Sequence, residues 1–253
     1  MTALTPPHAA LRCQAVLTID ATFAFGSAFA ESLRFREINP REAFTVVDAS
    51  DNFFRASLKS ISSEGGEALV YEAMNGSPES PARITLVCAV LGRQRMITVA
   101  QKATELGCVR IVPVLSDHSV QRADLEKEKP WAWQGQALKA SRQCRRASIP
   151  EVSKIVALGD ALAASYWTKA TRAFFLDDRA LASADPFQGL PVSGDYVLAI
   201  GPEGGWSDDE RLRLENAHAW ALRLGTRVLR AETAVFCGLS VMQHRLGDLG
   251  HPL

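Results

Sequence analysis

Residues 198–210 read LAIGPEGGWSDDE: an apolar run, a turn rich in glycine and proline, and a polar segment. The apolar run predicts a buried strand, and Ser207 followed three residues later by Glu210 predicts a capped helix. Glycine and proline directly after a strand leave a concave stretch of backbone against which a ligand can lie. In open parallel sheets, ligands bind beyond the carboxyl ends of the strands. This stretch therefore predicts a parallel sheet with a ligand pocket at its edge.

The kind of ligand follows from the charges beside the turn. Asp208, Asp209 and Glu210 crowd the first turn of the predicted helix, and three carboxylates repel a phosphate despite the favourable helix dipole. The sequence also lacks the lysine of a Walker loop and the GxGxxG fingerprint of a dinucleotide-binding turn. We therefore expect a neutral or cationic ligand at GPEGG (201–205).

The sequence from residue 84 onward alternates continuous apolar runs with segments of helical periodicity. Such alternation is typical of an α/β domain with a mostly parallel sheet and helices on both faces. The predicted strands cover 84–91, 109–115, 172–178, 195–205 (with the turn) and 221–225, and the predicted helices cover 95–107, 131–146, 207–217 and 232–249.

The first part of the chain has a different texture, with short pieces rich in valine, phenylalanine and threonine. They predict strands at 13–19, 42–49, 52–61 and 67–73, with one or two helical turns within 28–38. The composition of MNGSPESPAR (74–83) is typical of a linker. We therefore expect a small β domain over 1–73, a linker over 74–83 and an α/β domain over 84–253.

Composition and charge exclude several classes of protein. The 253 residues carry 28 basic and 28 acidic side chains, so net charge predicts no partner. Residues 76–150 hold twelve basic and six acidic side chains, which indicates either a basic surface for a polyanion or a solvated, salt-bridged face. Five widely spaced cysteines without a CxxC pair argue against a disulfide framework or a zinc site. No signal peptide or apolar stretch of membrane-spanning length is evident, so we expect a cytoplasmic protein.

A second motif, LGTRVLRAETA (224–234), follows about twenty residues after GPEGG. Gly225 interrupts a strand, and Arg230, Glu232 and Thr233 cluster where a loop enters the last predicted helix. Taken alone, this motif is either a functional site or an ordinary structural feature. In the structural interpretation, Thr233 is a helix cap and Arg230 with Glu232 is a surface salt bridge.

Together the two motifs resemble the SPOUT class of S-adenosylmethionine-dependent RNA methyltransferases. Within that class the chain is similar to the family that methylates uracil N3 in small-subunit (16S) ribosomal RNA (RsmE-like). QKATELGCVRIVPV (101–114) and ASRQCRRASIPEV (140–152) are similar to that family's central motifs, in the same order. The resemblance implies a trefoil-knotted α/β domain preceded by a PUA-like β domain that docks RNA. It also implies a homodimer through the knotted region, ribosomal RNA or the small ribosomal subunit as partner, and no metal.

The resemblance further implies which residues bind the cofactor, S-adenosylmethionine, and which act in catalysis. A Cβ at Gly204 or Gly205 is expected to push the cofactor off the main chain, and its sulfonium tolerates nearby carboxylates. Arg230 is expected to stabilise negative charge on the uracil oxygens, and Glu232 either takes the N3 proton or orients Arg230. The implied cofactor-binding residues are Ile200, Gly201, Pro202, Glu203, Gly204, Gly205, Leu224, Gly225, Val228, Leu229, Arg230, Thr233 and Ala234.

Contacts to RNA phosphates are expected from the basic segment and from one arginine of the N-terminal domain. That domain lacks the histidine of the family's motif, so both RNA docking by this domain and the identity of the RNA substrate stay open. Trp131 and Trp133 are candidates either for base stacking or for anchoring a helix, and His118, His218 and His244 receive no role. The candidate RNA-binding residues are Arg34, Arg93, Arg95, Lys102, Arg142, Arg145 and Arg146.

Three alternatives stay open. One is a SPOUT methyltransferase with another RNA target, such as a ribose 2′-hydroxyl. The second is a non-catalytic RNA-binding scaffold of the same fold. The third and weakest is a nucleotide hydrolase with a glycine-rich loop, because no lysine or magnesium-binding set accompanies GPEGG.

Overall fold

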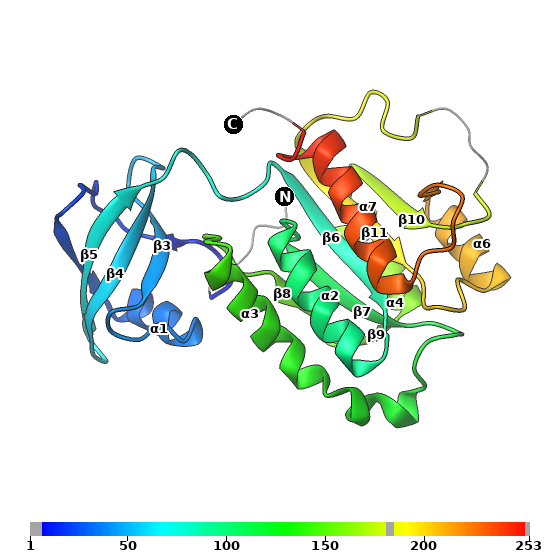
Figure 1. Ribbon diagram of the computed structural model, residues 1–253, viewed down its shortest axis with the longest axis horizontal. Coiled ribbons are helices and arrows are strands. Elements are labelled where there is room, and N and C mark those ends of the chain that lie inside the picture. Colours follow the sequence, from blue (N-terminus) through cyan, green and yellow to red (C-terminus); the bar gives the residue numbers. More distant parts are fainter. Residues whose placement is uncertain (1–6, 181–184, 251–253) are drawn as a thin grey trace. The chain divides into compact units, whose positions relative to one another are not determined.

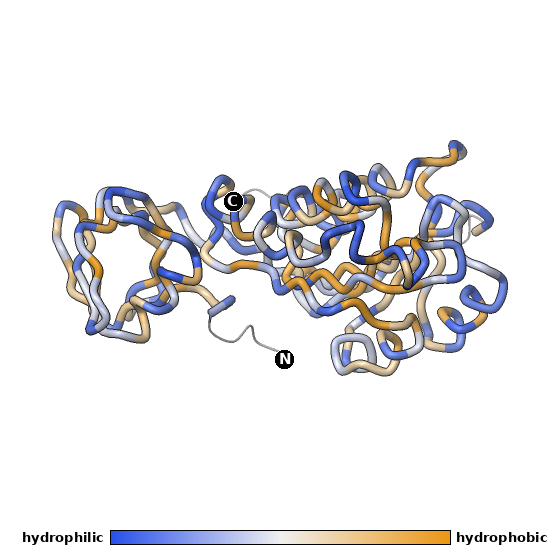
Figure 2. The backbone as a smooth tube through the Cα atoms, turned by 90° about the horizontal axis from the view of Figure 1, so that it is seen from below, coloured by the Kyte–Doolittle hydropathy of each residue, from blue (hydrophilic) through white to orange (hydrophobic). Residues whose placement is uncertain are grey.

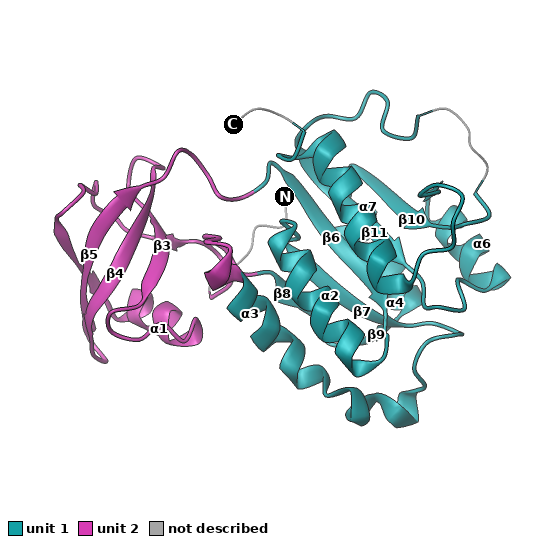
Figure 3. Ribbon diagram, viewed as in Figure 1, with its two compact units in different colours: residues 1–2, 80–140, 150–253 teal, residues 3–79, 141–149 magenta. Residues whose placement is uncertain are grey.

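The computed structural model describes residues 7–180 and 185–250. Their contacts divide the chain into two compact units (Figure 3). Unit 1 holds residues 80–140 and 150 onward, and unit 2 holds the residues before 80 together with 141–149. The sequence predicts 84–253 as one continuous domain, whereas here residues 141–149 group with the N-terminal part. No helix in the described ranges is both long and apolar enough to cross a membrane.

Unit 1 is built on a parallel sheet, as the alternating pattern predicts. Its described strands number seven, in the order β12-β10-β11-β6-β7-β8, with β9 also pairing with β7. The five predicted strands are all present, while the two-residue strands β8 and β9 are too short to show a pattern in the sequence. The strands are β6 (Ala82–Ala89), β7 (Arg110–Leu115), β8 (Glu151–Val152), β9 (Val156–Ala157), β10 (Arg172–Leu176), β11 (Gly194–Ile200) and β12 (Ala219–Leu222).

Helices cover both faces of this sheet. Leu86 and Cys88 of β6 pack in one apolar cluster with residues of α2 and α7, and Val87 packs in another with residues of α4, α5 and α6. Figure 1 shows α2 and α7 side by side on one face, and Figure 2 shows the apolar strands of unit 1 between more polar helices. The helical elements are α2 (Arg93–Glu105), η1 (Arg122–Glu128), η2 (Pro130–Ala132), α3 (Trp133–Gln143), α4 (Leu158–Ala163), α5 (Ser165–Thr168), α6 (Asp208–Asn216) and α7 (Ala231–Leu246).

Unit 2 contains a five-stranded curled sheet in the order β1-β3-β4-β5-β2, with helix α1 beside it. All its neighbouring strands are antiparallel except β1 and β3. Its apolar core gathers Phe23, Leu33, Phe44, Leu58 and Val70. The elements are β1 (Leu11–Arg12), β2 (Thr22–Gly26), α1 (Ser27–Phe35), β3 (Ala43–Val47), β4 (Phe53–Ile61) and β5 (Gly65–Ala73).

The predicted strand at 13–19 is wrong. Only Cys13 and Leu17 of that segment are buried, and the Leu17 amide donates to the Asp48 carboxylate (3.3 Å) rather than to a neighbouring strand. The strand β2 was not predicted. Its sequence, TFAFG, is short and lies between the two segments read as strand and helix.

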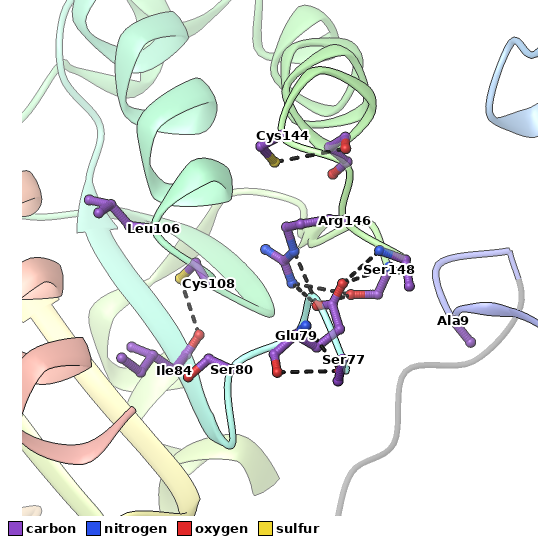
Figure 4. A network of polar contacts seen from close by, with 12 residues as sticks. Ala9, Ser77, Glu79, Ser80, Ile84, Leu106, Cys108, Cys144, Arg146 and Ser148 are labelled. Atoms are coloured by element: carbon purple, nitrogen blue, oxygen red, sulfur yellow. Dashed lines mark hydrogen bonds and ion pairs between the residues drawn. The ribbon is translucent and has the colours of Figure 1, made fainter. Parts of the chain in front are cut away.

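Residues 141–149 are joined to the rest of unit 2 by an ionic network, shown in Figure 4. One oxygen of Glu79 accepts hydrogen bonds from Arg146 Nη2 (2.6 Å), Arg146 Nε (3.1 Å) and Ser148 Oγ (2.6 Å). Its other oxygen accepts from the backbone amides of Ala147 (2.9 Å) and Ser148 (3.0 Å). The Arg146 side chain is 4% exposed and that of Glu79 is 22% exposed, so this pair is largely shielded from water.

A second arginine fixes the same segment. Arg36, 5% exposed, donates from Nη1 to the carbonyl of Ala147 (3.1 Å) and from Nη2 to the carbonyl of Ala9. Burial lowers the pKa of Arg36 to about 10, with a smaller opposing effect from Glu79. Thr45 Oγ1 also donates to the carbonyl of Arg145 (2.8 Å). These contacts join residues far apart in sequence, which is why periodicity cannot reveal them.

Removing the charge of Glu79 should destabilise unit 2 strongly. We expect Glu79→Gln to lower the free energy of unfolding by about 3 kcal/mol, because it removes the carboxylate charge that faces the buried Arg146 guanidinium. The matched control is Glu72→Gln, which breaks the exposed ion pair with Arg145 (3.2 Å) and should cost less than about 1 kcal/mol. Urea denaturation of the full chain measures both, and equal losses would mean that the Glu79 network adds nothing beyond a surface pair.

Candidate functional site

One cavity lies where three neighbouring strands of unit 1 end. The strands β12, β10 and β11 are adjacent and parallel, so the loops after them meet at one edge of the sheet. These loops enclose a cavity of about 680 Å³. It is lined by Leu176–Arg179 after β10, Ile200–Asp208 after β11, and most of Leu222–Leu229 after β12. Residues of α7 and His118, which follows β7, complete the lining.

The helix that follows GPEGG begins as predicted. Ser207 Oγ accepts from the Glu210 amide (3.2 Å), and the Glu210 carboxylate accepts from the Ser207 amide (3.0 Å), which forms a capping box. The second Glu210 oxygen accepts from the Asp117 amide (2.9 Å), and Ser207 Oγ donates to Asp117 Oδ2 (2.5 Å). The loop after β7 is thereby fastened to the start of α6.

Two of the three carboxylates in that first turn have partners within the protein. Glu210 is buried in the capping box, and Asp208 accepts from Arg179 Nη1 (2.7 Å). This hydrogen bond raises the pKa of the Arg179 guanidinium. The guanidinium also reaches the Trp206 carbonyl (3.2 Å) and the Asp177 carboxylate (3.4 Å), and Arg211 pairs with that same carboxylate. Arg179 therefore ties the end of β10 to the end of the GPEGG loop.

Two glycines of the GPEGG loop also have reasons within the protein itself. A Cβ on Gly204 would lie 2.9 Å from the Cβ of His118, so the glycine allows the loop after β7 to approach. Gly205 has a φ of +71°, a backbone conformation that favours glycine, and an added Cβ there would meet no protein atom within 4 Å. His118 Nδ1 lies 3.1 Å from the Gly205 carbonyl oxygen.

Most of the predicted cofactor-binding residues line this cavity. All of them do so except Arg230 and Thr233, which lie between lining residues where α7 begins. The sequence missed the segment after β10, although the strand RAFFLDD (172–178) was recognised. It also missed Trp206 and His118. The segment after β10 and the turn after β7 that holds His118 both follow buried strands directly, and this position could have indicated them.

The two predicted catalytic residues stand apart from the cavity lining. Arg230 occupies the N-cap position of α7, and its exposed side chain forms no ion pair within residues 7–180 and 185–250. Glu232 is half-buried, and its Oε2 has no hydrogen-bond partner among the described residues. No ion pair joins Arg230 to Glu232, so the surface salt bridge considered from the sequence is not formed.

The candidate RNA-binding residues fall in both units and differ in accessibility. Arg146 is buried against Glu79, so it offers no surface to a phosphate, and its predicted role is replaced by internal packing. Arg93 is exposed, Trp131 is 68% exposed and Trp133 is buried in the core of unit 1. The remaining candidates bond within their own units: Arg34 to the Ser62 carbonyl, Arg95 to Glu203, Lys102 to Glu105 (2.8 Å), Arg142 to Glu42 (2.8 Å) and Arg145 to Glu72 (3.2 Å).

In the part of the chain that the structure describes, no group of three or more histidine, cysteine, aspartate or glutamate side chains is arranged to hold a metal ion.

Known proteins similar to this chain are RNA methyltransferases by name. A family model described as an RNA methyltransferase domain matches residues 78–243. Ribosomal RNA small subunit methyltransferase E of Bacillus subtilis is 26% identical over 217 residues, covering 81% of this chain and 83% of that protein. The protein of that name from Aquifex aeolicus is 28% identical over 216 residues, covering 83% and 89%. A crystal structure of ribosomal RNA small subunit methyltransferase E from Neisseria gonorrhoeae, bound to S-adenosyl methionine, is 27% identical with a TM-score of 0.67, covering 96% of this chain and 100% of that one.

Proposed function

This chain belongs to the RNA methyltransferase domain family, and we propose that it transfers a methyl group from S-adenosylmethionine to N3 of a uridine in small-subunit ribosomal RNA. One observation carries the proposal. Both motifs that resemble the uracil-N3 methyltransferases, GPEGG and LGTRVLR, enclose the same cavity at the edge of the parallel sheet. Relatives named ribosomal RNA small subunit methyltransferase E support the choice of RNA.

The cavity fits S-adenosylmethionine in size and chemistry. Its volume of about 680 Å³ lies within the range of about 300–1,000 Å³ that is usual for small-molecule sites. Val228, 80% exposed, offers an apolar surface to a flat ring, and Asp178 also lines the cavity and can face a cation. When bound, the cofactor supplies a methyl group on a positively charged sulfur.

The residues of the chain then have separate tasks. Backbone from Ile200–Gly205 and Leu224–Leu229 holds the cofactor, with Ala234 closing the cavity from α7. The exposed guanidinium of Arg230 is placed to meet the substrate rather than the cofactor, where it stabilises charge developing on the uracil oxygens. Glu232, half-buried with one carboxylate oxygen shielded from water, is the candidate either to take the N3 proton or to orient Arg230.

We propose that unit 2 docks RNA, and that unit 1 forms the trefoil knot and the homodimer implied by the family resemblance. After the edge strand β12 the chain returns to place α7 against α2 and the central strands β6 and β11, which is compatible with such a knot. On α7, the partly exposed Val241 supports a contact between copies of this helix. Arg34, Arg142 and Arg145 are the basic side chains of unit 2 that we assign to RNA. A cytoplasmic location fits this substrate.

Titration calorimetry with S-adenosylmethionine and, separately, ATP tests the cofactor. We expect binding of the first only, whereas ATP binding would favour a nucleotide hydrolase. Small ribosomal subunits and free 16S RNA from cells without this activity are then incubated with enzyme and labelled cofactor, and the nucleosides are identified by mass spectrometry. We expect 3-methyluridine. A product methylated on the ribose would mean that the target is a ribose 2′-hydroxyl. The absence of any methylated product would favour a non-catalytic RNA-binding scaffold.

Arg179, which ties the end of β10 to the end of the GPEGG loop, should support cofactor binding. We expect Arg179→Ala to weaken S-adenosylmethionine binding about tenfold, or about 1.4 kcal/mol, because Asp208 and the Trp206 carbonyl lose their shared partner. Arg179→Lys should recover only part of this loss, because an ammonium cannot serve three acceptors in a plane. The matched control is Arg213→Ala, an exposed arginine on α6 outside the cavity lining. Calorimetry measures the affinity of all three variants, and unchanged affinity in Arg179→Ala would mean that Arg179 does not support cofactor binding.

A further inference from the structure

His118 lies in the turn between β7 and η1 and contributes to the lining of the cofactor cavity. Its ring is exposed, yet its position is defined by two contacts. Nδ1 lies 3.1 Å from the carbonyl oxygen of Gly205, and its Cβ and Cγ lie over Gly204. The residues on either side are also fixed. Asp117 bonds to Ser207 and Glu210, and Ser119 Oγ bonds within its own turn to the carbonyl of Ser116 (2.9 Å).

The contact with Gly205 determines where the ring proton resides. A carbonyl oxygen can only accept, so Nδ1 must donate, and in the neutral ring Nε2 then carries an unshared electron pair. A histidine whose tautomer is fixed in this way presents Nε2 as a proton acceptor. We infer that His118 is the general base that removes the N3 proton of the target uridine.

This inference rests on the proposed function and specifies one step of it. The bond between N3 and its hydrogen breaks, the proton passes to His118 Nε2, and the electron pair stays on N3. That pair forms the new bond to the methyl carbon, while the sulfur of the donor keeps the electrons of its broken bond and becomes a neutral thioether. The resulting imidazolium releases its proton to solvent, which the exposure of the ring permits.

The other groups around the cavity are less suited to this role. Arg179 and Asp208 bond to each other, and the carboxylate of Asp177 is occupied by Arg179 and Arg211. Glu203 pairs with Arg95. Arg223 and Arg227 also line the cavity but stay protonated, whereas Asp178 is an exposed carboxylate in the lining and is a competing base. Glu232 is absent from the lining, although its shielded Oε2 keeps it as a second competing base.

The tautomer can be measured without any turnover. In protein labelled with ¹⁵N-histidine, the ring shifts of His118 are assigned by comparison with His118→Gln, and the neutral form is observed at alkaline pH. We expect protonated Nδ1 and bare Nε2, the reverse of the tautomer that free histidine prefers. A ring protonated on Nε2 would overturn the inference, because that nitrogen could not accept a proton.

Single-turnover methyl transfer with saturating cofactor gives the second test. We expect His118→Gln to slow transfer to uridine RNA at least about a hundredfold, while His218→Gln, an exposed histidine outside the cavity lining, changes it less than about twofold. RNA containing 5-fluorouridine has a more acidic N3–H and needs a base less. With this RNA the deficit of His118→Gln should shrink to about tenfold or less.

An equal deficit on both RNAs would mean that His118 only supports the loop, and a normal rate would exclude it from the reaction. If Glu232→Gln shows the deficit that 5-fluorouridine relieves, and His118→Gln does not, the base is Glu232. Absence of 3-methyluridine from the wild-type reaction would instead contradict the proposed function, so the two failures are distinguishable.

Discussion

Replacing Gly204 by valine should reduce the affinity for S-adenosylmethionine more than about a hundredfold while the chain stays folded. The first carbon of the new side chain would lie 2.9 Å from His118 Cβ, closer than real Cβ atoms approach. Because Asp117 is fastened to the start of α6 through Ser207 and Glu210, the loop after β7 cannot retreat alone. The GPEGG loop must therefore shift, and the backbone that faces the cofactor shifts with it.

Titration calorimetry measures the affinity, and thermal unfolding with circular dichroism reports on the fold. Gly159→Val is the matched control, because an added Cβ at this exposed glycine of α4 meets no atom within 4 Å. Since the predicted clash is with His118, the double variant Gly204→Val with His118→Gly should regain part of the lost affinity. Full affinity in Gly204→Val alone would disprove the assignment of this loop to the cofactor.

The features of the fold that the sequence predicts are those encoded by local pattern. The strand β11 is buried on both faces, so it appears as a continuous apolar run, and the capping box of Ser207 and Glu210 lies within four residues. The segment 13–19 shows where such patterns fail. Its composition is typical of a strand, but beyond Cys13 and Ala15 its backbone leaves the neighbouring strand, and the Leu17 amide donates to the Asp48 carboxylate instead.

The features that could not be predicted depend on contacts between residues distant in sequence. Arg146 meets Glu79 across 67 positions, and this pair is one of the contacts that join residues 141–149 to unit 2. His118 meets Gly205 across 87 positions, so the sequence shows that His118 follows a buried strand but not which residue it contacts. The backbone cradle of the site was found from two glycine-containing motifs. The side chains that fasten it, Arg179 and Asp117, required the structure.

Replacing Arg230 by alanine should separate catalysis from cofactor binding. We expect kcat/KM for RNA methylation to fall about a hundredfold to a thousandfold, the usual cost of removing one donor that stabilises a developing negative charge. The dissociation constant for S-adenosylmethionine should change less than about threefold, because Arg230 does not line the cavity although its neighbours Leu229 and Ala231 do.

Arg230→Lys distinguishes a charge effect from a geometric one. If only positive charge matters, lysine should restore most of the rate. If two uracil oxygens are bonded by a planar guanidinium, lysine should restore little of it. The side chain is exposed at the N-cap position of α7, so its loss should leave the unfolding temperature nearly unchanged. A near-normal rate in Arg230→Ala, measured with saturating cofactor, would place the stabilising charge elsewhere. Arg227, on the same loop and lining the cavity, would then be the next residue to replace.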